Sequence, residues 1–408
     1  MKKIWIFLVL MGMIFITSCS KIKNVEINEV VNHVTNEITT KTVDVKDYSI
    51  EDVEDAIITC IEKVEDAVIG ISLKREVVHE VNDTNYVYYD TESLGSAVIY
   101  KRIENKDDGG TITSYTYYAY TNEHVVTSEQ TAYNHKAFAY IKQNDVEVEV
   151  EVLGKDKKLD VAVIKFDTYL LIEPVKLADS DSVKKGSIVV AIGNPEGFAY
   201  YGSSTKGIIS NVHVKKSVDT DSDGVNDFVC EYVQTDAAIN PGNSGGGLFL
   251  LDGTLVGIPS LKLVSNNIDN MGFAIPSNMV RIAAEEYLEK GLEIIRPHLG
   301  VICTAIRNCP SSFMISNEIY QWPNIYDGDE PYGVYISKVT GLGSLVGSGI
   351  EEKDIILKID GEKVIESNDI SAKLNSLDIY EIGDKVTLTY YSHTDKVIKD
   401  VEVILKQE

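Results

Sequence analysis

The chain has 408 residues, 44% of them hydrophobic, so it is long enough for about two or three globular domains with sizeable cores. Its formal net charge of −25 argues against nucleic acid and anionic membrane surfaces as electrostatic partners and favours basic ligands. The five cysteines include no C-x-x-C pair, which argues against a zinc site and against a thioredoxin-like redox motif.

The first residues have the features of a secretory signal peptide, predicted over residues 1–18. An apolar stretch from Ile4 to Ile16 follows two lysines and is too short for a stable membrane span. It leads into Thr-Ser-Cys19, which resembles a bacterial lipobox, so Cys19 is predicted to carry a lipid anchor. The alternative is an ordinary signal peptide with Cys19 incidental. Residues 19–47 are polar without firm periodicity, which is typical of a flexible tether.

The body of the chain is predicted to be mostly β. Apolar residues at helical spacing indicate an amphipathic helix over residues 48–68. Short β-rich runs broken by Gly, Asn, Asp and Pro then predict a sandwich or a pair of barrels. Residues 279–290 read as a helix that ends at Gly291. Beyond a boundary at Arg296-Pro297, the tail is predicted to form a smaller α+β unit, with a helix near residues 369–377.

The segment "DAAINPGNSGGGLFL" places Ser244 among four glycines. Glycine allows positive φ and close backbone approach, so this turn has a demanding shape. One interpretation is a tight loop between two strands. The other is a nucleophile turn, in which the N–H groups of Gly242, Asn243 and Ser244 form an oxyanion hole. Only a base elsewhere in the chain distinguishes the two.

His124 and Asp160 are the candidate base and its orienting acid. His124 follows a β run in "TNEHVVTS", and Asp160 opens an apolar strand in "KKLDVAVIKF". A lone histidine is usually a surface or core residue, and the aspartate also fits a simple turn. However, the order His124, Asp160, Ser244 is one known order of an acyl-transfer triad. His124 would then accept the serine proton, and Asp160 would fix the imidazole tautomer.

Six ordered motifs carry a family resemblance. "TNEHVV", "DVAVIKF", "AIGNPEG", "GIIS", "QTDAAINPGNSGG" and "GFAIPSN" together resemble the HtrA (Deg) family of trypsin-like serine proteases. The resemblance implies an all-β double-barrel protease domain over residues 48–296, with two six-stranded barrels and the cleft between them. It assigns the triad to His124, Asp160 and Ser244, implies hydrolysis without a cofactor, and implies a homotrimer as the working form.

The tail resembles the PDZ domain of the same family, in "HLGV" and "GSLVGSGIEEKDIILKIDGEKV". The resemblance implies a small α+β PDZ domain over residues 297–408, in which Leu299, Gly300 and Val301 offer amides to a peptide C-terminal carboxylate. A structural β unit without ligand is the alternative. An insertion near residues 302–331 departs from the family pattern and puts the ligand preference of the peptide groove in doubt. Within it, Cys303 and Cys309 are left open as a disulfide or as free thiols.

Two further sites are predicted near the serine. Ile239 and Leu261 are candidates for lining the primary specificity pocket, which would favour a small or medium aliphatic residue, with core packing as the alternative. The segment "DTDSDGVNDFVCE" reproduces the first nine positions of a calcium loop, but its twelfth position is Cys230 in place of glutamate. The alternative is a solvated acidic turn. The candidate ligands are Asp219, Asp221, Asp223, the Val225 carbonyl and Asp227.

These features predict a lipid-anchored, extracytoplasmic serine endopeptidase of bacteria that degrades unfolded or misfolded proteins. Its partners would be unfolded polypeptides, exposed peptide C-termini and the membrane through the lipid, with no nucleic acid. Calcium would order the acidic loop, which lies where the family has its sensor loop, and would raise activity. A processing protease with a narrow target and a catalytically silent peptide-binding scaffold remain as alternatives.

Overall fold

The computed structural model describes residues 50–407 apart from 82–83, 195–199, 221–227, 261–262, 264–269, 318, 320, 329 and 342. The predicted signal peptide, the predicted lipidation site at Cys19 and the predicted tether therefore lie outside the described residues. Within the described part, no helix is long and apolar enough to cross a membrane. The first predicted helix is present as α2 (Ile50–Val64), which buries Cys60 and Val64.

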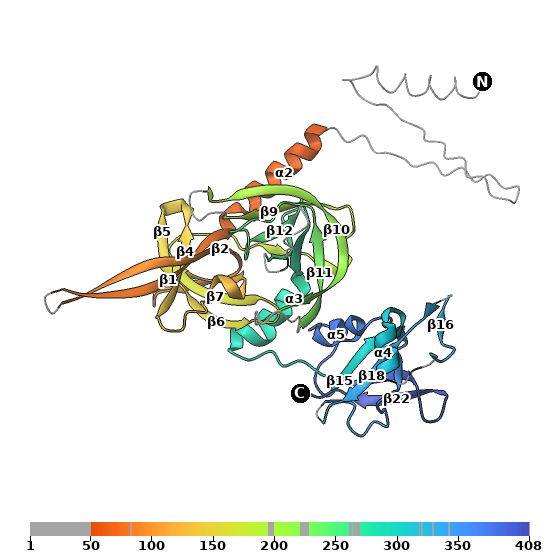
Figure 1. Cartoon of the computed structure of the whole chain (residues 1–408). Coiled ribbons are helices and arrows are strands. Elements are labelled where there is room, and N and C mark those ends of the chain that lie inside the picture. The colour runs from red at the N-terminus through yellow and green to blue at the C-terminus, as the bar shows by residue number, and fades with distance from the viewer. Residues whose placement is uncertain are drawn as a thin grey trace, which may run out of the picture. The chain divides into compact units, whose positions relative to one another are not determined.

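The first sheet of the predicted protease domain contains seven strands, in the order β5-β4-β1-β2-β3-β7-β6 (Figure 1). The resemblance implied six. The extra strand arises because Val150 interrupts one extended segment, and its N–H donates to the Ala137 carbonyl at 2.9 Å. This segment pairs with β4 on one side of the interruption and with β7 on the other, so it joins the two ends of the sheet. The strand bounds are β1 Val68–Val81, β2 Thr84–Lys106, β3 Ile112–Thr121, β4 His135–Ile141, β5 Val146–Glu149, β6 Glu151–Asp156 and β7 Val161–Thr168.

The second sheet has the order β12-β9-β10-β11-β14-β13-β8, and the additional pairing of β12 with β13 closes it into a barrel. Its seventh strand, β8, is only two residues long. Alternate residues of its strands face a core that includes Val189, Ile209, Val233 and Leu248. The strand bounds are β8 Lys176–Leu177, β9 Ile188–Gly193, β10 Ser203–Val218, β11 Phe228–Thr235, β12 Gly247–Leu250, β13 Thr254–Pro259 and β14 Gly272–Pro276.

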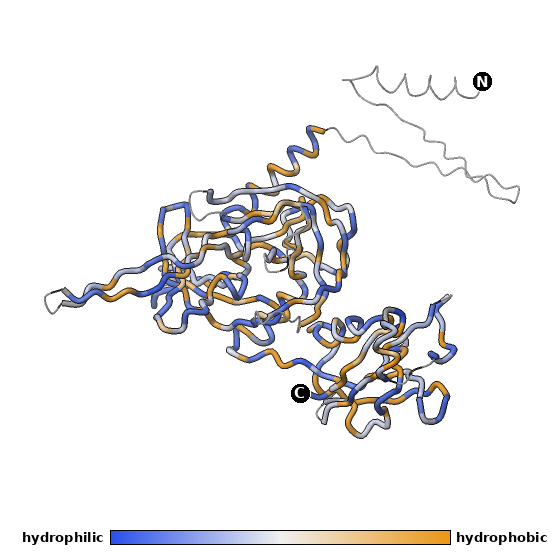
Figure 2. Tube along the Cα trace, viewed as in Figure 1, coloured by the Kyte–Doolittle hydropathy of each residue, from blue (hydrophilic) through white to orange (hydrophobic). Residues whose placement is uncertain are grey.

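Strands β1 and β2 extend beyond the first barrel as a long hairpin arm (Figure 1). The register continues outward through Val78 opposite Val87 and His79 opposite Tyr86. Both polar and apolar residues lie along this arm (Figure 2), and Tyr88 is 55% exposed. The arm therefore contributes little to the barrel core.

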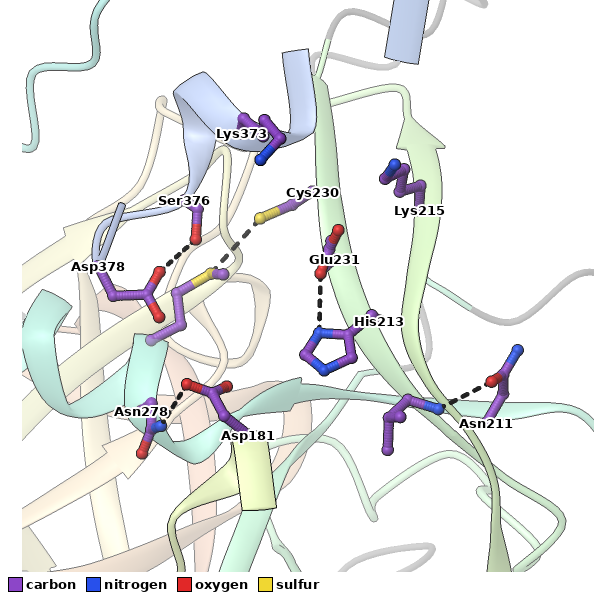
Figure 3. A network of polar contacts seen from close by, with 12 residues as sticks. Asp181, Asn211, His213, Lys215, Cys230, Glu231, Asn278, Lys373, Ser376 and Asp378 are labelled. Atoms are coloured by element: carbon purple, nitrogen blue, oxygen red, sulfur yellow. Dashed lines mark hydrogen bonds and ion pairs between the residues drawn. The ribbon is translucent and has the colours of Figure 1, made fainter. Parts of the chain in front are cut away.

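The helix predicted over residues 279–290 begins earlier and changes its geometry. It starts as α3 (Ser277–Ile282), widens to a π-helical turn over Ala283–Tyr287 and tightens to a 3-10 turn over Leu288–Lys290. Gly291 ends it with a φ of 67°, as predicted. The thiol of Cys230 on β11 lies 3.4 Å from the sulfur of Met279 on α3, so this helix packs against β11 (Figure 3). Beside this contact, His213 of β10 places Nδ1 2.9 Å from Oε2 of Glu231 on β11.

The tail forms the predicted α+β unit. Its main sheet runs β15-β18-β19-β21-β22, with β20 (Glu362–Lys363) beside β19. Helix α5 (Ser367–Asn375) packs Ile370 and Leu374 against one face of this sheet. Strand β15 ends the sheet on one side, so one of its edges is unpaired in the described structure. The bounds are β15 Val301–Ala305, β18 Val334–Val339, β19 Ile355–Ile359, β21 Lys385–Tyr391 and β22 Ile398–Ile404.

The predicted insertion packs against the sheet face that carries Tyr335, Ile355 and Leu357. These residues alternate along their strands with Val334, Ile336 and Ile356, which belong to the core shared with α5. The insertion therefore covers the face opposite α5. It contains a 3-10 turn Ile306–Asn308, helix α4 (Ser311–Ser316) and the hairpin of β16 (Tyr326–Asp327) with β17 (Glu330–Pro331).

Candidate active site

His124 and Asp160 come together at the end of the first barrel. His124 lies in a 3-10 turn directly after β3, and Asp160 directly precedes β7, the strand that pairs with β3. His124 Nδ1 lies 2.9 Å from each carboxylate oxygen of Asp160. The side chain of Asp160 is 6% exposed and that of His124 is 24% exposed. A carboxylate that accepts from Nδ1–H leaves Nε2 as the basic nitrogen of the neutral ring.

The Asp160 carboxylate is satisfied by donors from both barrels. The backbone N–H of His124 donates to Oδ1 at 3.1 Å. Ser260, which follows β13 of the second barrel, donates its hydroxyl to Oδ2 at 2.6 Å. Asp160 itself has a φ of 59°, a left-handed conformation that costs free energy for a residue with a Cβ. Asn122 stabilises this turn by donating its side-chain amide to the Asp160 carbonyl at 2.8 Å.

The Ser244 turn packs against the segment that carries His124. The Ser244 carbonyl accepts a hydrogen bond from Ser96 N–H of β2 at 2.9 Å. The following residue, Gly245, has a φ of 79°, and a Cβ there would collide with the Ser96 carbonyl and the Thr121 hydroxyl. It would also lie 3.1 Å from the backbone nitrogen of Asn122, two residues before His124. Glycine at position 245 is therefore required both for its φ and for the close approach of the two barrels.

Ser96 is a buried polar connection under this turn. Its hydroxyl donates to the Gly242 carbonyl at 2.7 Å and accepts from the backbone and side-chain amides of Asn194 at 2.9 and 3.0 Å. Ser96 and Asn194 are fully buried, so each of these bonds avoids the cost of an unpaired polar group. The network fixes the Gly242 carbonyl on the side of the turn away from solvent.

One of the three predicted oxyanion donors is used within the turn itself. Gly242 has a φ of 98°, again in the region that favours glycine. The N–H of Asn243 donates to the Asn240 carbonyl at 3.0 Å, so it closes the turn and does not face a substrate. The prediction therefore narrows to the N–H groups of Gly242 and Ser244.

Ile239, one of the two residues predicted to line the specificity pocket, packs partly buried against the core of the second barrel. A Cβ at Gly272 would lie 2.7 Å from its side chain, so Gly272 makes room for it. The other residue, Leu261, lies outside the described residues. Pro259 ends β13, and its carbonyl accepts from Gly245 N–H at 3.3 Å.

The predicted carboxylate-binding residues lie at the start of β15. Leu299 is 2% exposed and belongs to the core shared with α5. Gly300 has a φ of 77°. The carbonyls of Leu299 and Gly300 accept from Leu345 N–H and Thr340 N–H at 3.1 and 2.8 Å. Their own N–H groups donate to no residue that the structure describes. Val301 follows as the first residue of the edge strand.

The four described cysteines are free thiols, so Cys303 and Cys309 are not joined by a disulfide. Burial raises the pKa of Cys303 to about 11, which keeps it protonated at neutral pH.

Of the predicted calcium ligands, only Asp219 is described, and Asp221, Asp223, Val225 and Asp227 lie outside the described residues. In the described ranges, no group of three or more acidic, histidine or cysteine side chains is placed to hold a metal ion.

Sequence reasoning missed Ser260, Ser96, Asn122 and Asn194. All four are buried polar residues, and all but Asn122, which lies two residues before His124, contact the site from segments distant in the sequence. Asn122 and Asn194 lie within the motifs "TNEHVV" and "AIGNPEG", which gave a local signal, whereas no motif pointed to Ser260 or Ser96.

Comparisons with known proteins agree with this geometry. The family model described as a trypsin-like peptidase domain matches residues 107–258, and the PDZ domain model matches residues 297–405. Among solved structures, an "HtrA-type protease AlgW with decapeptide" superposes with a TM-score of 0.60 at 24% identity, covering 86% of this chain and 99% of that chain. This likeness shows the fold.

Curated relatives show the family. A "Serine protease Do-like HtrA" of Lactobacillus helveticus is 33% identical over 78% of this chain and 69% of the relative. A protein of the same name from Bacillus subtilis (strain 168) is 32% identical over 78% of this chain and 65% of the relative. A "Serine protease Do-like HtrB" of the same organism is 33% identical over 72% of this chain and 58% of the relative. The chain therefore belongs to the HtrA family of serine proteases and is a serine endopeptidase with a trypsin-like peptidase domain and a PDZ domain.

Proposed function

We propose that this endopeptidase cleaves unfolded or misfolded polypeptides through His124, Asp160 and Ser244. The observation that carries the proposal is the contact of His124 Nδ1 with the buried Asp160 carboxylate at 2.9 Å. It supports a neutral imidazole that presents Nε2 as a general base. The docking of the Ser244 turn against the segment of His124 supports the same assignment.

In this mechanism, His124 takes the proton of the Ser244 hydroxyl as the oxygen attacks the substrate carbonyl. The imidazolium that forms is stabilised by Asp160 and then gives its proton to the leaving amine. The N–H groups of Gly242 and Ser244 would bind the oxyanion of the tetrahedral intermediate. One such donor is typically worth about 3 kcal/mol of the activation barrier. In the second half of the reaction, His124 takes a proton from water as the water oxygen attacks the acyl carbonyl. The imidazolium then returns this proton to the Ser244 oxygen, which releases the acyl group as an acid.

Labelling with a serine-directed phosphonate tests the triad. The native chain is expected to be labelled strongly, whereas Ser244→Ala and His124→Ala should give almost no labelling, because one lacks the nucleophile and the other its base. His79→Ala is the matched control, since His79 lies on the hairpin arm against Tyr88 and is expected to leave labelling unchanged. Equal labelling of native chain and His124→Ala would contradict the assignment.

The PDZ domain is proposed to bind exposed peptide C-termini at Leu299, Gly300 and Val301. The undonated N–H groups of Leu299 and Gly300 and the unpaired edge of β15 support this role, because a peptide strand needs both.

We further propose that the protein acts outside the cytoplasm as a lipoprotein anchored at Cys19, and that it works as a homotrimer. The signal-like sequence of residues 1–18 supports the first of these, and the family resemblance supports the second.

We also propose that calcium orders the acidic loop of Asp219–Asp227 and raises activity, although hydrolysis itself needs no cofactor. The spacing of the acidic residues supports this proposal. Calcium added to a chelated sample is expected to raise the melting temperature and the peptidase rate, because the cation relieves repulsion among the four acids. Asp223→Asn and Asp227→Asn together should remove the response. A melting temperature and a rate that calcium leaves unchanged would reject the proposal.

A further inference from the structure

A cavity lies on the sheet face of the PDZ domain that the insertion covers. Its volume is about 570 Å³, within the range of about 300–1,000 Å³ typical of small-ligand sites. The insertion contributes Trp322, and strands β18, β19 and β21 contribute Tyr335, Ile355 and Tyr391. The cavity is distinct from the predicted peptide groove, because α5 and Leu299 belong to the core on the opposite face of the same sheet.

The floor of the cavity is aromatic. Tyr335 and Ile355 are at most 4% exposed and belong to a cluster of apolar side chains on this face. The ring of Trp322 packs edge-on against Tyr335, with centroids 5.7 Å apart and an interplanar angle of 65°. On its other side, Tyr335 is held edge-on by Phe313, with centroids 5.9 Å apart. Tyr335 is thus a buried base, and the half-buried rings of Trp322 and Tyr391 are left to contact an aromatic or other apolar group.

The rim of the cavity is basic in a strongly acidic chain. Lys353 and Lys396, the rim lysines, both line the cavity. Neither has a carboxylate within ion-pair distance in the described part of the chain, although many of its other lysines do. His393 also lines the cavity, and its pKa is lowered by burial and then by the charges of Lys396 and Lys353. Lys396 Nζ lies 3.3 Å from His393 Nδ1, which places this ammonium group beside the imidazole on the rim.

Among the described acidic residues, Asp354 opposes the effect of the two lysines on the pKa of His393, and its effect is the smaller one. The Asp354 carboxylate accepts the backbone N–H groups of His393 and Glu351 at 2.8 and 2.9 Å. Burial, and after it the charge of Glu352, raises the pKa of Tyr335. Both rim lysines also have left-handed backbones, with φ of 76° for Lys353 and 61° for Lys396. Such conformations cost free energy for residues with a Cβ and concentrate at functional sites.

We propose that this cavity binds an organic carboxylate with an aromatic body, with the ring against Trp322 and Tyr391 and the carboxylate at the rim lysines. An inorganic anion would contact the rim lysines without using the ring of Trp322, and an uncharged aromatic molecule would contact the rings without pairing the charges of Lys353 and Lys396. A ligand that carries both groups uses both parts of the cavity. The carboxylate belongs either to a free small acid or to the end of a peptide whose last residue is aromatic.

Tryptophan fluorescence tests the site directly. The chain has two tryptophans, Trp5 and Trp322, so the full chain carrying Trp5→Phe reports on the cavity alone. Ser244→Ala is added to prevent proteolysis, which makes the result independent of the proposed function. Phenylacetate is expected to change the Trp322 emission saturably. Phenylacetamide, which has the same ring without the charge, is expected to bind about tenfold more weakly.

Substitution of the rim lysines is the second arm. Lys353→Gln with Lys396→Gln is expected to weaken phenylacetate about tenfold and to leave phenylacetamide unchanged. Lys385→Gln with Lys399→Gln removes the same charge from the same domain and is the matched control. Those two lysines pair with Glu402 and Asp395 and do not line the cavity, so they should leave binding unchanged.

An acetylated tripeptide ending in phenylalanine distinguishes the two sources of the carboxylate. Lysine-dependent binding of both the tripeptide and phenylacetate would support peptide ends as a source, and binding of phenylacetate alone would support free acids. The proposal is overturned if neither ligand gives a saturable change. It is also overturned if phenylacetamide binds as tightly as phenylacetate, or if the control pair weakens binding as much as the rim lysines do.

Discussion

Asp160 shows how a single residue connects both barrels to the catalytic chemistry. A buried carboxylate is costly unless hydrogen bonds satisfy it, and here one donor comes from the backbone of His124, one from its ring and one from Ser260. The first two lie in the same barrel as Asp160, and the third crosses from the second barrel. Orientation of the imidazole therefore depends on correct packing of the two barrels, because the hydrogen bond from Ser260 to Asp160 forms only when they are packed.

Replacement of Ser260 by alanine is expected to lower kcat/KM by about tenfold, because a hydrogen bond to a charged group is typically worth about 1.5–3 kcal/mol. The Ser260 hydroxyl is fully buried and donates to Asp160 Oδ2 at 2.6 Å, so water cannot readily replace it. Ser260 acts through Asp160 and His124, which makes it a positioning residue. Peptide hydrolysis under steady-state conditions measures the effect, and Ser260→Thr is expected to restore part of the rate.

Ser277→Ala is the matched control for this prediction. Ser277 is equally buried and donates its hydroxyl to the Ala178 carbonyl at 2.8 Å, away from the catalytic residues. Ser277→Ala should lose about 1 kcal/mol of unfolding free energy, and Ser260→Ala about 1.5–3 kcal/mol, because its acceptor is charged. Only Ser260→Ala should lose activity. A similar loss of kcat/KM in both variants would show that the effect of Ser260 is one of general stability.

At the scale of secondary-structure elements, local patterns were sufficient where a residue's environment follows from its neighbours in sequence. The alternation of exposed and buried residues along β10 and the end of the last protease helix at Gly291 are of this kind. The apolar spacing that predicted the last protease helix did not reveal the π-helical turn at Ala283–Tyr287. Over so few residues, a spacing of three and four fits an α-helix and a single π-helical turn equally well. Local patterns also did not reveal the interruption at Val150, because the residues on either side are equally extended.

The residues of the candidate site also fall into two groups: those that the local sequence reveals and those that only the folded structure reveals. His124, Asp160 and Ser244 could be found because each lies in a short motif of distinctive composition. Ser260 could not, because its role depends on a contact between side chains 100 residues apart in the chain. The same holds for the buried pair of Asp156, at the end of β6, with Arg296, whose guanidinium lies 5.1 Å from the Phe228 ring centre. Buried polar residues of this kind are recognisable only when the barrel that buries them is known.

The whole molecule carries a strong negative charge, and this affects which substrates reach the site. A formal net charge of −25 attracts basic chains and repels acidic ones over distances set by the ionic strength. Salt screens this attraction within about 8–10 Å near physiological ionic strength. An unfolded polypeptide is long enough to sample the field over much of the protein surface, so its capture should respond to salt more strongly than that of a short peptide.

A lysine-rich unfolded protein is therefore expected to show a kcat/KM that falls several-fold as sodium chloride is raised from low to physiological concentration. The same protein with its lysines succinylated is the matched control, because its length and disorder are kept while its charge is reversed. Its kcat/KM should be lower at low salt and should rise as salt screens the repulsion. Initial cleavage rates at substrate concentrations well below KM give the comparison. If both substrates respond to salt with the same sign and size, capture is not governed by the net charge, and the local surface around His124 sets the preference instead.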